Sequence, residues 1–62
     1  MNTEIAKKHI EKSIMTYNMF NFQSNKSYAE GQIVLSKALD LITVKEAADY
    51  QGKIDKIIIQ ID

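Results

Sequence analysis

The 62-residue chain contains no cysteine, proline, tryptophan or arginine, and it has only two glycines and one histidine. Without cysteine it cannot form disulfides, a redox pair or a thiolate metal site. A lone histidine without neighbouring ligands argues against zinc, and two isolated glycines do not make a phosphate-binding loop. No nucleophile lies beside a base. The sequence therefore predicts no catalytic residue, no metal site and no cofactor, and it favours a protein that is not an enzyme.

Neither positive nor negative charge is in excess, since eight lysines are balanced by eight acidic residues and the formal net charge is zero. No positive field attracts the chain to a phosphate backbone, so nucleic-acid binding is disfavoured. No apolar run reaches the roughly 18 residues of a membrane span, and the first residues do not resemble a signal peptide. We therefore expect a cytoplasmic protein that does not bind membranes. Frequent isoleucine, lysine and asparagine fit an AT-rich genome, such as that of a low-GC bacterium, its phages or its plasmids.

The length allows one small domain over residues 1–62, and a chain this short buries only roughly 60% of the surface that its unfolded form exposes. Hydrophobic residues nevertheless make up 45% of the chain. This is more than one side of each short helix would use. We therefore predict that a homo-oligomer completes the fold.

The first helix is expected to begin at Asn2 or Thr3, because apolar residues then recur at helical spacing on one face. Near its end further apolar residues widen this face, either to pack on the following helices or to form a contact surface for a partner, since methionine adapts well to interfaces. The polar segment 21–26 predicts the end of the helix. The inward residues are Ala6, Ile10, Ile14 and Tyr17, and the widening residues are Met15, Met19, Phe20 and Phe22.

Two Ser/Thr-x-x-Glu capping boxes predict two more helices, one beginning at Ser27 and the other at Thr43. Their apolar stripes are expected to face each other across a corner at Ile42 and Thr43, which gives a helical hairpin. A short strand at residues 57–61 is an alternative. The second stripe consists of Tyr28, Leu35, Leu39 and Ile42, and the third of Ala47, Tyr50, Ile54, Ile57 and Ile61, broadened by Ile58.

Residues 42–52, ITVKEAADYQG, resemble the opening of the helix-turn-helix of excisionase-type DNA-binding proteins. That resemblance implies a DNA-binding regulator in which Thr43 caps a helix, Gly52 makes the turn and a recognition helix follows. Lys53 and Ile54 depart from the family pattern, because the family has a buried aliphatic residue and a Ser or Thr cap at these positions.

A shorter segment, Ser36-Lys37-Ala38-Leu39-Asp40, is similar to the Ser-Gln-Glu-Leu-Asp signature of small two-helix aspartyl-phosphate phosphatases. The resemblance implies that Asp40, carried on an antiparallel hairpin, acts on the phosphoaspartate of a partner protein.

Taken together, the patterns predict an all-α protein of two to three helices, arranged as a helical hairpin or three-helix bundle. The function that they favour is regulatory interaction, as an adaptor or inhibitor that docks an apolar helical face on itself or on a larger protein. DNA binding and phosphatase activity are the two alternatives. The expected partner-binding residues are Met15, Met19, Phe20, Phe22, Ile57, Ile58 and Ile61.

Overall fold

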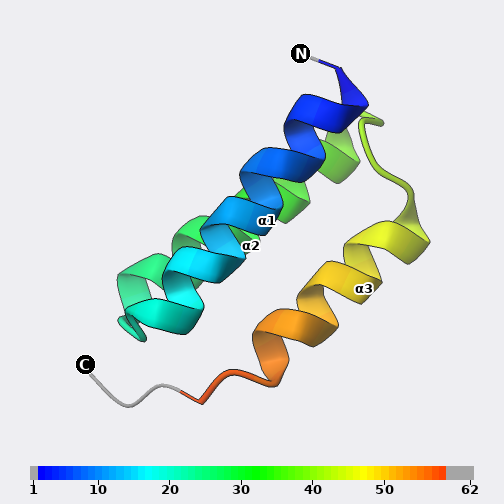
Figure 1. The fold of residues 1–62 in the computed structure, drawn as a ribbon. Coiled ribbons are helices and arrows are strands. Elements are labelled where there is room, and N and C mark those ends of the chain that lie inside the picture. The colour runs from blue at the N-terminus through cyan, green and yellow to red at the C-terminus, as the bar shows by residue number, and fades with distance from the viewer. Residues whose placement is uncertain (1, 59–62) are drawn as a thin grey trace.

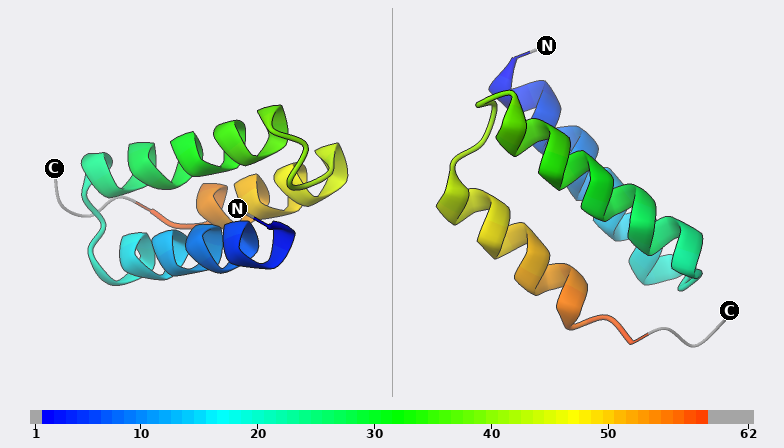
Figure 2. Two further views of the ribbon diagram at one scale, coloured as in Figure 1. Left: turned by 90° about the horizontal axis from the view of Figure 1, so that it is seen from above. Right: turned by 180° about the vertical axis from the view of Figure 1, so that it is seen from behind.

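A computed structural model describes residues 2–58, which form three α-helices and, within that range, no strand (Figure 1). The helices are α1 (Thr3–Met19), α2 (Gln23–Ala38) and α3 (Val44–Asp55). α1 and α2 form an antiparallel hairpin, and α3 lies along one side of both (Figure 2). The predicted all-α, three-helix arrangement is confirmed. Most of the alternative strand, residues 59–61, lies outside the described residues.

α1 begins where its sequence indicates, because Oδ1 of Asn2 accepts a hydrogen bond of 2.9 Å from the backbone N–H of Ile5. This bond satisfies one of the free N–H groups of the first turn. The predicted inward face is largely correct. Ser13 is buried in addition, and Ile14 is partly buried at the edge of the core. The buried residues of α1 are Ala6, Ile10, Ser13 and Tyr17.

The turn between α1 and α2 is shorter than the sequence suggests. Asparagine side chains satisfy carbonyl groups at the end of α1: Nδ2 of Asn21 donates to the Tyr17 carbonyl oxygen, and Nδ2 of Asn25 donates to that of Phe20, both at 2.8 Å. With the chain reversed in this way, α2 begins at Gln23. The predicted start at Ser27 is therefore wrong, and Ser27 lies inside α2.

α2 ends at Ala38 in a turn whose backbone hydrogen bonds follow the Schellman pattern. The N–H of Leu41 donates to the Ser36 carbonyl oxygen (2.9 Å), and the N–H of Asp40 donates to that of Lys37 (3.0 Å). Asp40 adopts the left-handed conformation, with φ at 58°. The helix therefore stops before Ile42, and residues 39–43 connect α2 to α3.

The capping box at the start of α3 is confirmed. Oγ1 of Thr43 accepts from the Glu46 N–H (3.0 Å), and Oε1 of Glu46 accepts from the Thr43 N–H (2.9 Å). α3 ends at Asp55, earlier than the heptad spacing predicts. Ile57 packs against the core from beyond the helix, and Ile61 lies outside the described residues.

The core shows that the stripe expected on the second helix is wrong for three of its four residues, since only Ile42 is buried. Tyr28, Leu35 and Leu39 are each about 60% exposed, and α2 instead buries Ala29, Ile33 and Ser36. Small residues on the inner side let neighbouring helices approach closely, while the larger side chains from α1 and α3 supply the volume. The fully buried large side chains are Tyr17, Ile10 and Ile54.

Polar contacts hold α3 against both other helices. Lys7 on α1 pairs with Glu46 at the start of α3. Further along α3, Nε2 of Gln51 donates to Oε2 of Glu30 on α2 at 2.9 Å. With α3 fixed on this side, the opposite side of the α1–α2 hairpin remains open.

Candidate protein interaction surface

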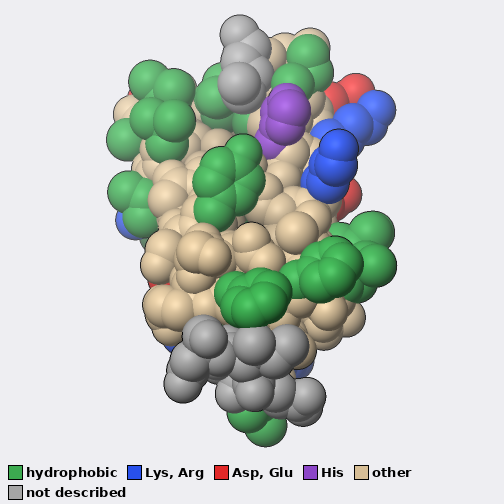
Figure 3. Space-filling view, turned by 90° about the vertical axis from the view of Figure 1, so that its left-hand side faces the viewer, with side chains coloured by type: hydrophobic (Ala, Val, Ile, Leu, Met, Phe, Trp, Pro, Cys, Tyr) green, Lys and Arg blue, Asp and Glu red, His purple; other side chains and the backbone are tan. Residues whose placement is uncertain are grey.

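The open side of the hairpin, here called the α1–α2 face, carries large apolar side chains. Tyr28, Leu35 and Leu39 follow one another along α2 at helical spacing, with 62%, 59% and 59% of their surfaces exposed. Figure 3 shows this face from the side opposite α3, where hydrophobic side chains gather above and to the left of the single histidine, His9. Exposed apolar residues that form a continuous patch mark sites of interaction more often than scattered ones do.

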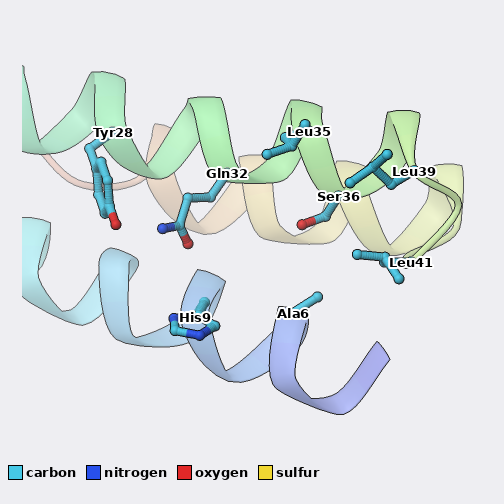
Figure 4. Close-up of a pocket in the computed structure, with 8 residues that line it drawn as sticks. All are labelled: Ala6, His9, Tyr28, Gln32, Leu35, Ser36, Leu39 and Leu41. Carbon is cyan, nitrogen blue, oxygen red and sulfur yellow. The ribbon is translucent and has the colours of Figure 1, made fainter. Parts of the chain in front are cut away.

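A hollow of about 220 Å³ lies in this face between α1 and α2. Figure 4 shows Tyr28 and Gln32 reaching from α2 towards α1, where His9 and Ala6 lie. The opening is bordered mainly by apolar groups, so it suits the side chains of a protein partner better than a charged ligand. Its lining residues are Ala6, His9, Tyr28, Gln32, Leu35, Ser36, Leu39 and Leu41.

A second hollow, of about 400 Å³, extends the first along the same face. The two share His9, Tyr28 and Gln32 as lining residues. The second is more polar, because Lys12 and Thr16 border it. Between them, the Ser13 hydroxyl donates to the His9 carbonyl oxygen (2.8 Å), and its Oγ lies 3.1 Å from Oε1 of Gln32. The face therefore grades from an apolar end to a polar end.

The outer side of α2 is also free of charge. The three charged residues of this helix, Lys26, Glu30 and Lys37, share the side that turns towards α3, where Glu30 bonds to Gln51. On the outer side every exposed residue is uncharged. A helix that faces water normally carries its charged residues there. The exposed residues of this outer side are Ser24, Ser27, Tyr28, Gly31, Val34, Leu35 and Ala38.

Gly31 lies in the middle of this uncharged surface. A Cβ atom built at Gly31 would meet nothing within 4 Å. A close approach within the described chain therefore does not explain the glycine. Glycine costs about 1 kcal/mol relative to alanine inside a helix. The fold of the single chain gives no reason for accepting this cost.

The structure places the predicted partner-binding residues at one end of the bundle. Met15, Met19, Phe20 and Phe22 are 40–65% exposed at the end of α1 and in the following turn. The segment after α3 lies beside this end, since Asn18, Asn21, Ile57 and Ile58 border one hollow and Tyr17 donates to the Ile57 carbonyl oxygen at 3.4 Å. Ile58 is 76% exposed, Ile57 is partly buried, and Ile61 lies outside the described residues.

Sequence reasoning missed Tyr28, Leu35 and Leu39 as surface residues, because it assigned that stripe of the second helix to the core. A usable signal was present. The charged residues of α2 all fall on one side of the helix, so the remaining apolar residues cover more than an inward face. That pattern indicates a second contact surface on the helix.

The turn expected from the helix-turn-helix resemblance is not formed, because α3 continues through Gly52 to Asp55. The glycine has helical backbone geometry and no positive φ. The lysines that would have to meet DNA, Lys45, Lys53 and Lys56, are exposed, but Asp49 is exposed among them.

The phosphatase resemblance implied that Asp40, carried on an antiparallel hairpin, is the functional residue. Asp40 follows the end of α2, in the left-handed position of the turn. Ser36, the first residue of the motif, is buried in the hairpin. The two side chains therefore do not share an exposed helical face.

Among residues 2–58, two titratable groups have shifted pKa values, and both lie on α3, away from the α1–α2 face. The Lys7 ammonium, assisted by the Thr43 backbone N–H, lowers the pKa of the Glu46 carboxyl. Burial, together with the Glu11 carboxylate, raises the pKa of Tyr50 to about 12. Within residues 2–58, no three His, Asp or Glu side chains gather as a metal site would require. These perturbations belong to the packing of α3.

Comparison with protein-family models, curated proteins and solved structures finds no match for this chain. None of the three helices in the described part of the chain is long and apolar enough to cross a membrane.

Proposed function

We propose that this protein is a small, non-enzymatic regulator that acts by binding a protein partner through its α1–α2 face. The observation that carries the proposal is the uncharged outer side of α2, which places Tyr28, Leu35 and Leu39 in water beside an apolar hollow. Covering them gains roughly 25 cal/mol for each Å² of apolar surface removed from water. The protein would serve as an adaptor or inhibitor in the cytoplasm.

The partner chemistry that fits best is the apolar side of another helix. The hollow is bordered by the exposed apolar residues of α2, so a helix that packs on the uncharged outer side of α2 would also cover the edge of the hollow and extend the bundle. Met19, Phe20 and Phe22 extend apolar surface towards one end of the molecule. They would add contacts to a partner that reaches beyond the hollow.

Site-specific photo-crosslinking in expressing cells tests this proposal. A photoreactive residue placed at Leu35 should give discrete protein adducts. The same residue placed at Val44 should not, although Val44 is a 74% exposed apolar residue at the start of α3. A third placement, at Met19, tests the end of the bundle.

The adducts from Leu35 should also disappear when Leu39→Glu introduces a charge into the face, while circular dichroism shows unchanged helix content. Equal adducts from Leu35 and Val44, or adducts that survive Leu39→Glu, would show that the α1–α2 face is not a specific binding surface.

A further inference from the structure

The outer side of α2 carries a regular alternation of large and small residues. Tyr28, Gly31, Leu35 and Ala38, here called the α2 seam, follow one another at intervals of three, four and three residues. This spacing keeps them in one line along a helix that packs against another. All four are exposed. The four residues thus have the spacing of a helix–helix contact, but no helix of the described chain packs against them.

Building on the proposed function, we infer that the partner is a second copy of this chain, bound by antiparallel packing of the two α2 seams. The two pairs Tyr28 with Ala38 and Gly31 with Leu35 are both centred on residue 33. A two-fold axis that crosses the seam at the level of residue 33 therefore places each large residue of one copy opposite a small residue of the other. A two-fold contact uses the same surface twice, so it requires this self-complementarity.

The seam also explains Gly31. The space beside it is open in the single chain, and a Cβ would touch nothing within 4 Å. In the antiparallel pair that space receives Leu35 of the second copy. Glycine at this position allows the two helices to approach closely enough for the leucine to be covered.

Charge supports a second copy of the chain over a charged partner. In this pairing each seam residue packs against an uncharged residue of the other copy, so a charge on the seam would be buried without an opposite charge to pair with it. The outer side of α2 carries none, because Lys26, Glu30 and Lys37 lie on the side that turns towards α3. The exposed Lys12 of α1 borders the same hollow as Tyr28 at one end of the seam.

The surface required is compatible with the size of the protein. A stable interface of standard size takes roughly 800 Å² from each partner. This is about a fifth of the 4423 Å² of accessible surface of one chain. The seam supplies its central residues, and the neighbouring Val34 and Leu39, each about 60% exposed, widen it on both sides.

The solution mass over a concentration series is the first test. The unmodified protein should show twice the 7.1 kDa of one chain. Leu35→Glu places two carboxylates in the seam and should return the protein to a monomer with unchanged helix content. The matched control is Val44→Glu, which changes an equally exposed apolar residue on α3 and should leave the dimer intact. A monomer at every concentration, or equal loss of the dimer in both variants, would overturn the inference.

Disulfide trapping tests the register, and the chain has no native cysteine to interfere. A Tyr28→Cys chain mixed with an Ala38→Cys chain should form a mixed disulfide. Either variant alone should crosslink far less. In the antiparallel pair, position 28 lies ten residues along the helix from its own copy, roughly 15 Å, whereas a disulfide needs Cα atoms within about 7 Å. Preferential crosslinking of each variant with itself would overturn the antiparallel seam.

Failure of this inference can be told apart from failure of the proposed function. A monomeric protein whose Leu35 position still gives specific adducts with a different protein would overturn the second copy and keep the interaction face. A photoreactive residue at Leu39 should give adducts with the mass of two copies. Loss of these adducts when Leu35→Glu is added would support both the second copy and the interaction face.

Discussion

The phenol of Tyr50 on α3 donates a hydrogen bond of 3.1 Å to Oε2 of Glu11 on α1. Tyr50 is only 8% exposed, and burial is the main reason that its pKa rises to about 12, with the Glu11 carboxylate adding to the shift. Both effects oppose formation of the phenolate. The bond therefore joins α1 and α3 through two residues that are 39 positions apart in the chain. It forms only while the phenol keeps its proton.

Alkaline pH should destabilise the fold through Tyr50. The unfolded phenol loses its proton near pH 10 and the folded one near pH 12, so the unfolded state binds fewer protons between these values and stability falls as pH rises. The contribution of Tyr50 should be complete below about pH 10 and lost through about pH 12. Tyr50→Phe should lower the free energy of unfolding by about 1 kcal/mol near neutral pH and reduce the alkaline decrease.

Urea unfolding from about pH 8 to about pH 12 measures both effects of Tyr50→Phe. The exposed tyrosine Tyr28 provides the control, since Tyr28→Phe should keep the alkaline decrease of the unmodified protein. An unchanged alkaline decrease in Tyr50→Phe would contradict the assignment.

The orientation of α2 can be tested with two substitutions only two residues apart. Ile33 is 4% exposed and Leu35 is 59% exposed. Ile33→Ala should cost about 2–5 kcal/mol through the cavity that it leaves, most of the roughly 3–9 kcal/mol expected for a domain of this length. Leu35→Ala should change stability by only about 0.5 kcal/mol in dilute, monomeric protein. Chemical denaturation at low concentration measures both, and equal costs would contradict this orientation of α2.

The two capping boxes expected from the sequence should differ in their effect on stability. Thr43→Ala removes a side chain that accepts the Glu46 N–H, and it should cost about 1 kcal/mol. Ser27 lies inside α2, so Ser27→Ala should be neutral or should stabilise the protein by about 0.3 kcal/mol. Thermal unfolding of both variants provides the comparison. A larger cost for Ser27→Ala than for Thr43→Ala would move the start of α2 back to Ser27.

The turn after α2 offers a stabilising substitution. Asp40 has φ at 58°, a conformation that costs less for glycine than for residues with a Cβ. Asp40→Gly should therefore stabilise the protein by about 0.5–1 kcal/mol, which is a rise of a few degrees in the melting temperature. Asp40→Ala is the matched control and should not stabilise it. If both variants melt at the same temperature, the left-handed turn does not limit stability.

The inward face of α1 and the start of α3 could be predicted from the sequence because their signals are local. On α1, Ala6, Ile10 and Tyr17 form one apolar line opposite charged residues, so only one orientation buries them. At Thr43 the capping box needs only residues three positions apart. The start of α2 was not predictable in this way, because the Asn21 and Asn25 side chains form the preceding turn through bonds to the end of α1.

The sequence by itself determined that this protein forms helices, which side of α1 faces inward and where α3 begins, because these features depend on residues within one or two helical turns. Only the tertiary structure decided which apolar side of α2 is buried. That choice depends on the fit of Ala29, Ile33 and Ser36 against two other helices, and no local signal reports such a fit. The same choice leaves Tyr28, Leu35 and Leu39 exposed, and it thereby creates the face on which the proposed function rests.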